Sequence, residues 1–234
     1  IGEKVSTICK NLGIAYVFKA SYRKANRTSA NSFTGIGDDT GMELIKKVGA
    51  KFNVPTTSDI HAHDEAAIAA KYIDILQIPA FLCRQTDLLI AAAETGKIVN
   101  VKKGQFLAPW DTVNIAEKMR SFGCEKFFLT ERGTTFGYNN LVADMRSLYW
   151  MRKEGIPVIF DATHSVQRPG GNGGTTGGDG ELAPVLARAA IATGIDGLFM
   201  ETHSNPAAAL SDGPNQIPLA DMEPLLVKLQ ALHL

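Results

Sequence analysis

The fold of this chain is decided by the stretch Val99-Asn100-Val101-Lys102-Lys103-Gly104-Gln105-Phe106. In this stretch a short apolar run stops at cationic and amide side chains, as a buried strand of a parallel sheet does where it reaches the sheet's edge. Other apolar runs stop at reactive groups in the same way, after Phe18, Leu129, Phe160 and Met200. Strands with reactive groups at their carboxyl ends form the active site of a (β/α)8 barrel, so the pattern predicts an α/β fold of that kind.

Strand and helix patterns alternate over the rest of the sequence, which predicts a parallel sheet covered by helices. The expected strands cover residues 15–18, 55–59, 73–78, 98–103, 126–131, 157–161 and 197–201. The expected helices cover residues 1–12 and 42–52 and begin near Asp64, Thr86, Thr112, Leu141, Glu181 and Pro218. Three of the helices are expected to end at Gly13, Gly96 and Gly123, because glycine is the usual residue after the last helical turn.

Seven strands are one fewer than a closed barrel needs, so a first strand is expected before Ile1. An open doubly wound sheet is the alternative. It would carry a glycine-rich nucleotide fingerprint after a strand, and the sequence has none. With 234 residues, of which 45% are hydrophobic, the chain is expected to form one barrel domain over residues 1–234.

Charge and cysteine content exclude several classes of protein. Lys plus Arg and Asp plus Glu both number 24, so the chain lacks the positive balance of nucleic-acid-binding proteins. Its three cysteines have neither metal-binding spacing nor the even number of a disulfide framework. The sequence has no run of eighteen apolar residues and no signal peptide, so we expect a cytoplasmic protein that does not bind membranes.

Cationic side chains are the first candidate site residues. At one mouth of a barrel they would bind a small phosphate or carboxylate ligand, which arginine can bind bidentately. The set consists of Lys19, Lys24, Arg27, Lys103 and Arg132. Lys103 next to Lys102 also fits a Schiff-base aldolase, since a neighbouring cation lowers the pKa of an amine.

A second candidate set, His164, Glu201 and Asp212, follows the last two strands. An imidazole and two carboxylates can bind a divalent metal or perform acid–base catalysis, and a hydrogen-bonded structural histidine is the alternative. The segment over residues 169–180 contains seven glycines and cannot pack a core. Its position predicts a lid over the substrate, with a surface linker as the alternative.

Long motifs of the chain cover residues 24–29 (KANRTS), 77–87 (QIPAFLCRQTD), 100–106 (NVKKGQF), 131–139 (ERGTTFGYN) and 161–167 (DATHSVQ). They resemble the 3-deoxy-D-manno-octulosonate 8-phosphate synthases, also called 2-dehydro-3-deoxyphosphooctonate aldolases, and the similarity extends from Val17 to Leu219. The resemblance implies a (β/α)8 barrel, usually a homotetramer, that condenses phosphoenolpyruvate with D-arabinose 5-phosphate and water. The products are 3-deoxy-D-manno-octulosonate 8-phosphate, which is used in lipopolysaccharide biosynthesis, and inorganic phosphate.

The resemblance also implies roles for individual residues. Phosphoenolpyruvate would be bound by Lys19, Lys24, Gln77, Lys103, Gln105 and Arg132. Arabinose 5-phosphate would be bound by Asn26, Arg27 and Asp59, and its phosphate also by Arg84 of a neighbouring subunit. The catalytic residues would be Lys24, Lys103, His164 and Asp212. Lys103 would then be an electrostatic clamp that stabilises the departing phosphate, and not a Schiff base.

The family has two branches, one with and one without a divalent metal. The metal-dependent branch binds its metal through Cys, His, Glu and Asp, and the other branch has Asn in place of the Cys. His164, Glu201 and Asp212 match ligands shared by both branches, and the Cys or Asn would belong to the expected first strand. Ser211-Asp212-Gly213-Pro214-Asn215 is more similar to the metal-dependent branch. A metal such as Zn, Fe, Mn or Cd is therefore expected, and a metal-independent site is the alternative.

The chain departs from the family pattern at three positions. Arg23 stands where the family usually has Asp, and Thr34 and Gly180 stand where it usually has Arg. The loss of two basic groups would weaken binding of the sugar phosphate. Two other functions are therefore kept as alternatives: a related synthase that uses another sugar phosphate, such as erythrose 4-phosphate, and, if the first strand is absent, an inactive phosphate-binding remnant.

Overall fold

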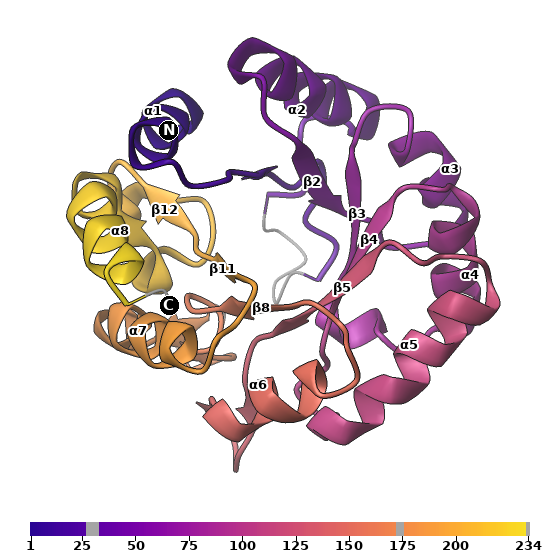
Figure 1. Cartoon of the computed structure of the whole chain (residues 1–234). Coiled ribbons are helices and arrows are strands. Elements are labelled where there is room, and N and C mark those ends of the chain that lie inside the picture. Colours follow the sequence, from indigo (N-terminus) through magenta and orange to yellow (C-terminus); the bar gives the residue numbers. More distant parts are fainter. Residues whose placement is uncertain (27–32, 172–175, 233–234) are drawn as a thin grey trace. The chain divides into compact units, whose positions relative to one another are not determined.

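The computed structural model describes residues 1–26, 33–171 and 176–232. The chain divides into two compact units, whose elements are labelled in Figure 1. The N-terminal unit comprises Gly2–Lys102 and Val113–Phe128, and the C-terminal unit comprises Lys103–Thr112 and Leu129–Leu234 together with Ile1. A single domain over residues 1–234 stays a prediction.

The N-terminal unit alternates parallel strands with helices. Its strands are β1 (Phe18–Lys19), β2 (Thr56–Asp59), β3 (Ile75–Ile78) and β4 (Ile98–Lys102), and they pair in this order. Its helices are α1 (Gly2–Leu12), α2 (Asp38–Phe52), α3 (Ala66–Ala69), α4 (Thr86–Glu94) and most of α5 (Thr112–Ser121), with 3-10 turns η1 (His63–Glu65) and η2 (Ala80–Leu82). Figure 1 shows α2, α3 and α4 along one side of β2, β3 and β4.

The C-terminal unit contains the parallel strands β5, β8 and β11, which also pair in this order. These strands are β5 (Phe127–Glu131, whose first two residues belong to the N-terminal unit), β8 (Val158–Asp161) and β11 (Gly197–Phe199). Its helices are α6 (Met145–Arg152), α7 (Ala183–Ala192) and α8 (Met222–Gln230). Its 3-10 turns are η3 (Pro109–Asp111), η4 (Gly180–Leu182), η5 (Pro206–Ala208), η6 (Gly213–Asn215) and η7 (Leu219–Asp221).

Three small strand pairs complete the C-terminal unit. They are β6 (Thr134–Thr135) with β7 (Leu141–Val142), β9 (Gln167–Arg168) with β10 (Gly177–Gly178), and β12 (Thr202–His203) with β13 (Ile217–Pro218). Among the described residues, the parallel strands follow the order β1-β2-β3-β4 in the N-terminal unit and β5-β8-β11 in the C-terminal unit. The prediction of an α/β fold with a parallel sheet is confirmed, and these are the seven strands that the sequence predicts.

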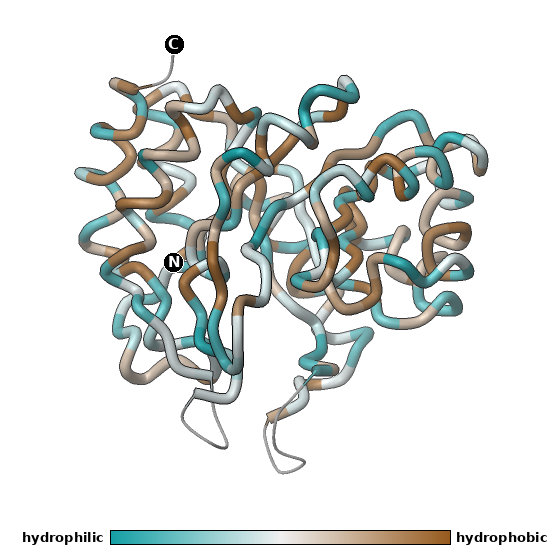
Figure 2. The backbone as a smooth tube through the Cα atoms, turned by 90° about the horizontal axis from the view of Figure 1, so that it is seen from below, coloured by the Kyte–Doolittle hydropathy of each residue, from teal (hydrophilic) through white to brown (hydrophobic). Residues whose placement is uncertain are grey.

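The central strands are apolar because both of their faces are covered. Leu76 and Ile78 of β3 and Val99 and Val101 of β4 are all 0% exposed, as expected for parallel strands beneath helices. The helices alternate brown and teal along their turns in Figure 2, which is the pattern of helices with one apolar face. Burial of these apolar faces is the main favourable contribution to the stability of each unit.

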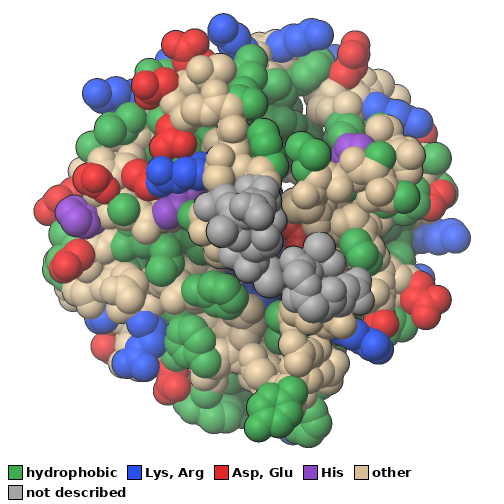
Figure 3. All heavy atoms as spheres, turned by 180° about the vertical axis from the view of Figure 1, so that it is seen from behind, with side chains coloured by type: hydrophobic (Ala, Val, Ile, Leu, Met, Phe, Trp, Pro, Cys, Tyr) green, Lys and Arg blue, Asp and Glu red, His purple; other side chains and the backbone are tan. Residues whose placement is uncertain are grey.

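The surface agrees with the balanced charge of the sequence. Figure 3 shows lysine and arginine side chains interspersed with acidic ones over the face that it draws, and neither sign forms a continuous patch there. Among the helices of the described residues, none has the length and apolar run needed to cross a membrane.

The helix ends are mostly where the sequence predicts them. Gly13, Gly96 and Gly123 follow α1, α4 and α5 with φ angles of 68°, 68° and 77°, so each uses the left-handed conformation that favours glycine. The predicted bounds of the first strand were wrong, because it covers Phe18–Lys19 and not residues 15–18. The strand begins at Phe18 because the first hydrogen bond between β1 and the chain at β2 is donated by Phe18 N–H to Pro55 O, at 2.9 Å.

A second correction concerns the helix predicted to begin near Leu141. Leu141–Val142 instead forms β7, which pairs with Thr134–Thr135. Helix α6 begins at Met145, and the Asp144 carboxylate caps it by accepting from Arg146 N–H at 3.0 Å. The apolar pair before the cap resembles the start of a helix in sequence, and its pairing partner is not visible from periodicity alone.

In each unit, an aspartate just before one strand accepts a hydrogen bond from the first residue of a neighbouring strand. Asp74, just before β3, accepts hydrogen bonds from Thr56 N–H and from the Thr56 hydroxyl, both at 2.9 Å. Asp196, just before β11, accepts from Val158 N–H at 2.8 Å. Thr56 and Val158 are buried first residues of β2 and β8. Each aspartate therefore satisfies a buried N–H group and joins one strand start to the next.

We predict that Asp74→Ala lowers the free energy of unfolding by about 1.5 kcal/mol, because the buried Thr56 N–H and hydroxyl lose a charged acceptor. Urea denaturation followed by circular dichroism measures this change. Glu117→Ala is the control, because it removes an exposed carboxylate on α5 of the same unit; its effect should stay within about 0.5 kcal/mol. Equal losses in the two variants would contradict the role given to Asp74.

Candidate active site

Charged side chains gather at the carboxyl ends of the parallel strands of the C-terminal unit. Glu131 and Asp161 are the last residues of β5 and β8, and Glu201 follows β11. The strand ends are nearly level, because Glu131 pairs with Phe160 and Asp161 pairs with Phe199. This parallel register places the loops that follow the strands at one edge of the unit, where sites of parallel α/β proteins form.

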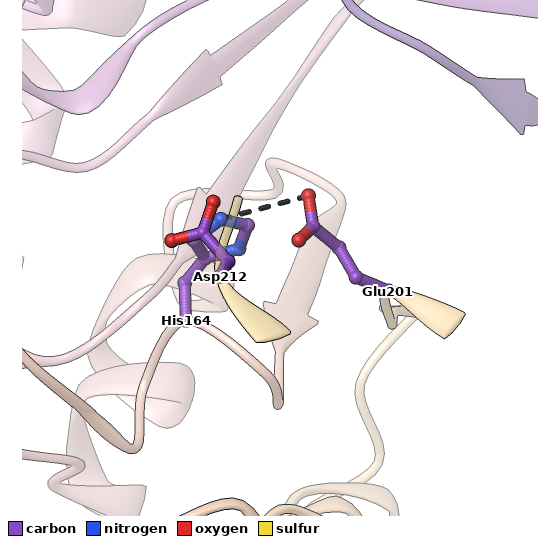
Figure 4. A group of neighbouring side chains, drawn as sticks. All are labelled: His164, Glu201 and Asp212. Atoms are coloured by element: carbon purple, nitrogen blue, oxygen red, sulfur yellow. Dashed lines mark ion pairs between the residues drawn. The ribbon is translucent and has the colours of Figure 1, made fainter. Parts of the chain in front are cut away.

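The predicted set His164, Glu201 and Asp212 comes together at this edge. Each of the three offers one ligand atom, and these atoms all lie within 4.8 Å of one another. His164 Nε2 lies 3.7 Å from Glu201 Oε1, and Figure 4 shows the imidazole facing both carboxylates. The three side chains are half-buried, so a small ligand can reach them. The structure brings the three predicted residues together, and their role as a site stays a prediction.

Asp161 fixes the orientation of the His164 ring. Its Oδ2 lies 2.7 Å from His164 Nδ1, and its Oδ1 accepts from His164 N–H at 2.9 Å and from the Thr163 hydroxyl at 3.2 Å. Asp161 is 0% exposed, so its carboxylate depends on these partners for its solvation. A carboxylate at Nδ1 makes that nitrogen the donor, and the other ring nitrogen, Nε2, faces the Glu201 carboxylate.

Gln167 connects the triad to Arg132. Gln167 Nε2 donates to Asp212 Oδ1 at 2.8 Å, and Gln167 Oε1 accepts from Arg132 at 2.5 Å. Burial lowers the pKa of the Arg132 guanidinium, and the nearby Asp161, Glu131, Asp212 and Glu201 carboxylates raise it. An arginine is protonated in either case, so it supplies a fixed positive charge beside the triad.

Lys103 is 0% exposed and is held by oxygen atoms of its own unit. Its Nζ donates to the carbonyl oxygens of Gly104 and Leu107 at 3.2 and 3.1 Å and to the Thr134 hydroxyl at 3.2 Å. Glu131 Oε2 lies 3.5 Å away, and Glu131 is itself 1% exposed. Three acceptors and a carboxylate match an ammonium group, which has three donors and no lone pair. This geometry favours the electrostatic clamp over the Schiff base.

A row of polar side chains crosses the N-terminal unit. Asn100 Nδ2 donates to Gln77 Oε1 at 2.8 Å, Gln77 Nε2 donates to Asp59 Oδ1 at 2.7 Å, and Asp59 Oδ2 lies 3.4 Å from Lys19 Nζ. Burial alone would raise the pKa of Asp59, but Lys19, Lys102 and the bond from Gln77 hold it well below its usual range. Asp59 is therefore a carboxylate with fixed orientation, as a binding site for sugar hydroxyls needs.

The remaining predicted residues have more varied surroundings. Lys24 is half-buried and its N–H donates to Thr34 O at 2.8 Å, whereas Asn26 and Arg84 are exposed. Gln105 is buried, and its Oε1 has no hydrogen-bond partner among the described residues. Arg27 and residues 172–175 of the glycine-rich segment lie outside the described residues, so the lid stays a prediction.

Two of the three departures from the family pattern have local explanations. Arg23 pairs with Asp38 at 3.0 Å and with Glu65, so its charge is directed to two acids of its own unit. At Gly180 there is no room for a side chain, because an added Cβ would overlap the carbonyl oxygen of Pro214. Nothing in the structure explains Thr34.

Sequence reasoning missed four residues that hold the predicted ones in place. They are Asn100, Glu131, Asp161 and Gln167. The signal for Asn100, Glu131 and Asp161 was present, because a polar residue inside or at the end of an otherwise apolar strand needs a buried partner. Gln167 begins the two-residue strand β9 and has no such signal. All four lie within the motifs that carry the family resemblance.

Comparison with known proteins agrees with the resemblance. Relatives named 2-dehydro-3-deoxyphosphooctonate aldolase, from Trichlorobacter lovleyi, Geotalea uraniireducens and a Cyanothece species, are 59%, 58% and 55% identical to this chain. The aligned residues cover 98%, 98% and 100% of the chain and 85% of each relative. The model of the DAHP synthetase I family matches residues 1–233. With a match over nearly its whole length, the chain belongs to the DAHP synthetase I family.

Proposed function

We propose that the chain acts as a 3-deoxy-D-manno-octulosonate 8-phosphate synthase. It condenses phosphoenolpyruvate with D-arabinose 5-phosphate and water, and it releases inorganic phosphate and the eight-carbon sugar phosphate used in lipopolysaccharide biosynthesis. The observation that carries this function is the shared name of relatives that are 55–59% identical over almost the whole chain. The clustered cations and carboxylates at the strand ends fit two anionic substrates.

We also propose the finer features that the family resemblance implies. The parallel strands would belong to a closed (β/α)8 barrel, in which one further strand completes the sheet. The protein would assemble as a homotetramer in the cytoplasm, and the exposed Arg84 would bind the sugar phosphate held by a neighbouring subunit.

The reaction needs fixed positive charge and an oriented water molecule. C3 of phosphoenolpyruvate attacks the aldehyde carbon of the sugar phosphate, and the oxygen of water bonds to C2. The bond between C2 and the phosphate oxygen then breaks, and inorganic phosphate leaves with the bonding electrons. We propose that Lys103 and Arg132 stabilise the phosphate and carboxylate charges. In a metal-independent site, the lone pairs of His164 Nε2 and of the Asp212 carboxylate would orient the water and accept its proton.

The residues of the triad fit a divalent metal. One imidazole nitrogen and two carboxylates suit ions of the Zn, Fe, Mn or Cd class, and Asp161 gives His164 the outer carboxylate typical of metal-bound histidines. We propose that His164, Glu201 and Asp212 hold such an ion, which would polarise an oxygen atom of the bound reactants. A metal-independent site with the same three residues is the second candidate, and the predicted Cys or Asn distinguishes the two.

We predict that the purified protein releases inorganic phosphate from phosphoenolpyruvate only when arabinose 5-phosphate is also present. A chelator should abolish the release, and added Zn²⁺ or Mn²⁺ should restore it. A colorimetric phosphate assay measures both effects, and erythrose 4-phosphate serves as the control sugar. Release that resists the chelator would support the metal-independent site. A folded protein that releases no phosphate would instead be a phosphate-binding remnant.

We predict that Asp161→Asn weakens metal binding by about 10- to 100-fold, because the carboxylate that orients His164 is lost. Competition with a chromophoric chelator measures the affinity for Zn²⁺ independently of turnover. Asp144→Asn is the control, because Asp144 caps α6 in the same unit and lies outside the triad. Unchanged Zn²⁺ affinity in Asp161→Asn would contradict the outer-ligand role.

We predict that Lys103→Met lowers kcat/KM by about 10²- to 10³-fold, because one fixed cation no longer stabilises the departing phosphate. Lys153→Met removes an exposed lysine of the same unit and should leave the activity unchanged. Borohydride added during turnover tests the alternative directly. Covalent trapping of substrate on Lys103 by mass spectrometry would restore the Schiff-base aldolase.

A further inference from the structure

We infer that Gln167 is a positioning residue that couples the Arg132 cation to the Asp212 carboxylate. This inference rests on the proposed function, in which Arg132 binds phosphoenolpyruvate and Asp212 belongs to the metal triad. The amide of Gln167 spans the two groups, with 2.5 Å from its oxygen to Arg132 and 2.8 Å from its nitrogen to Asp212. One side chain therefore sets the position of a substrate-binding group and of a metal ligand.

The partners of Gln167 fix which way its amide points. A guanidinium only donates hydrogen bonds, so it must face the amide oxygen, and an ionised carboxylate only accepts them, so it must face the amide nitrogen. Gln167 is 8% exposed, which leaves little water to replace either bond. Neither an apolar side chain nor a carboxylate at this position could serve both partners, because one of them would face a group of the wrong kind.

The backbone around Gln167 is held against the loop that carries Asp212. Gln167 pairs with Gly178 in the β9–β10 ladder, and an added Cβ at Gly178 would overlap Asn215 Oδ1. Asn215 Nδ2 donates to Gly177 O at 3.3 Å, and Asn215 N–H donates to Asp212 O at 2.9 Å. The side chain of Asn215, in the Asp212 loop, thus packs against the backbone of β10. This contact keeps Gln167 within reach of Asp212.

Asp212 itself needs such support. Its φ angle of 55° places it in the left-handed region, which non-glycine residues seldom occupy and which aspartate enters more often than most of them. The surrounding contacts must maintain that conformation, and the bond from Gln167 acts directly on the side chain. Loss of Gln167 would therefore free the Asp212 carboxylate and the Arg132 guanidinium together, and Gln167 would act on the reaction only through these two groups.

The test compares Gln167→Met, which keeps the length of the side chain and loses both hydrogen bonds, with Ser147→Ala. Ser147 is also buried in the C-terminal unit and loses one hydrogen bond, to Asp144 O. Four quantities are measured: the Zn²⁺ affinity by competition with a chromophoric chelator, the phosphoenolpyruvate affinity by calorimetry, and the KM for each of the two substrates. Circular dichroism and Tm show whether each variant is folded.

We expect Gln167→Met to weaken Zn²⁺ binding by about 10- to 100-fold and phosphoenolpyruvate binding by about tenfold. The KM for arabinose 5-phosphate should change less than twofold, and Ser147→Ala should resemble the wild type. A folded Gln167→Met with wild-type affinities overturns the inference, and a wild type that binds no Zn²⁺ overturns its metal half. Absence of phosphate release by the wild type refutes the proposed function instead, because both affinities are measured without turnover.

Discussion

The site depends on one constraint: a charged group removed from water must be given a partner. Lys103 and Asp161 are both 0% exposed, and each has such a partner, Glu131 for the lysine and His164 for the aspartate. The partners also remove rotational freedom, so the charged atoms of Lys103 and the His164 ring have fixed orientations. Preorganisation of this kind is the largest general contribution of a protein to the stabilisation of developing charge.

The register of the parallel strands determines which polar side chains lie opposite one another. In the N-terminal unit Asp59 lies opposite Gln77, and Gln77 lies opposite Asn100, so their side chains form a continuous hydrogen-bonded row. Each of the strands β2, β3 and β4 contributes one polar residue to the row, and β2 also buries Thr56, Thr57 and Ser58. An amide suits the interior of such a row because it donates at one atom and accepts at the other, whereas a charged residue is best placed at the row's end, where Asp59 meets Lys19.

The sequence predicted the strands well because they follow from local pattern, and it singled out three residues that the structure brings together. Seven apolar runs became the seven parallel strands, and residues after the last two strands became the triad. The β6–β7 pair was missed because Leu141–Val142 is too short to show a period of two. Gln167 was missed because its importance comes from two partners distant in sequence, Arg132 and Asp212. The residue pattern within a short stretch of sequence does not show which distant residues a side chain will contact.

The close contact at Gly180 restricts which substitutions the chain can accept at this position. The family pattern expects arginine there, but an added Cβ would overlap the Pro214 carbonyl oxygen, two residues beyond Asp212. The substitution is therefore accessible only after the backbone near Pro214 has moved, and that movement passes through the neighbourhood of a proposed metal ligand. A side chain at position 180 and the backbone conformation of the Asp212 loop therefore constrain each other.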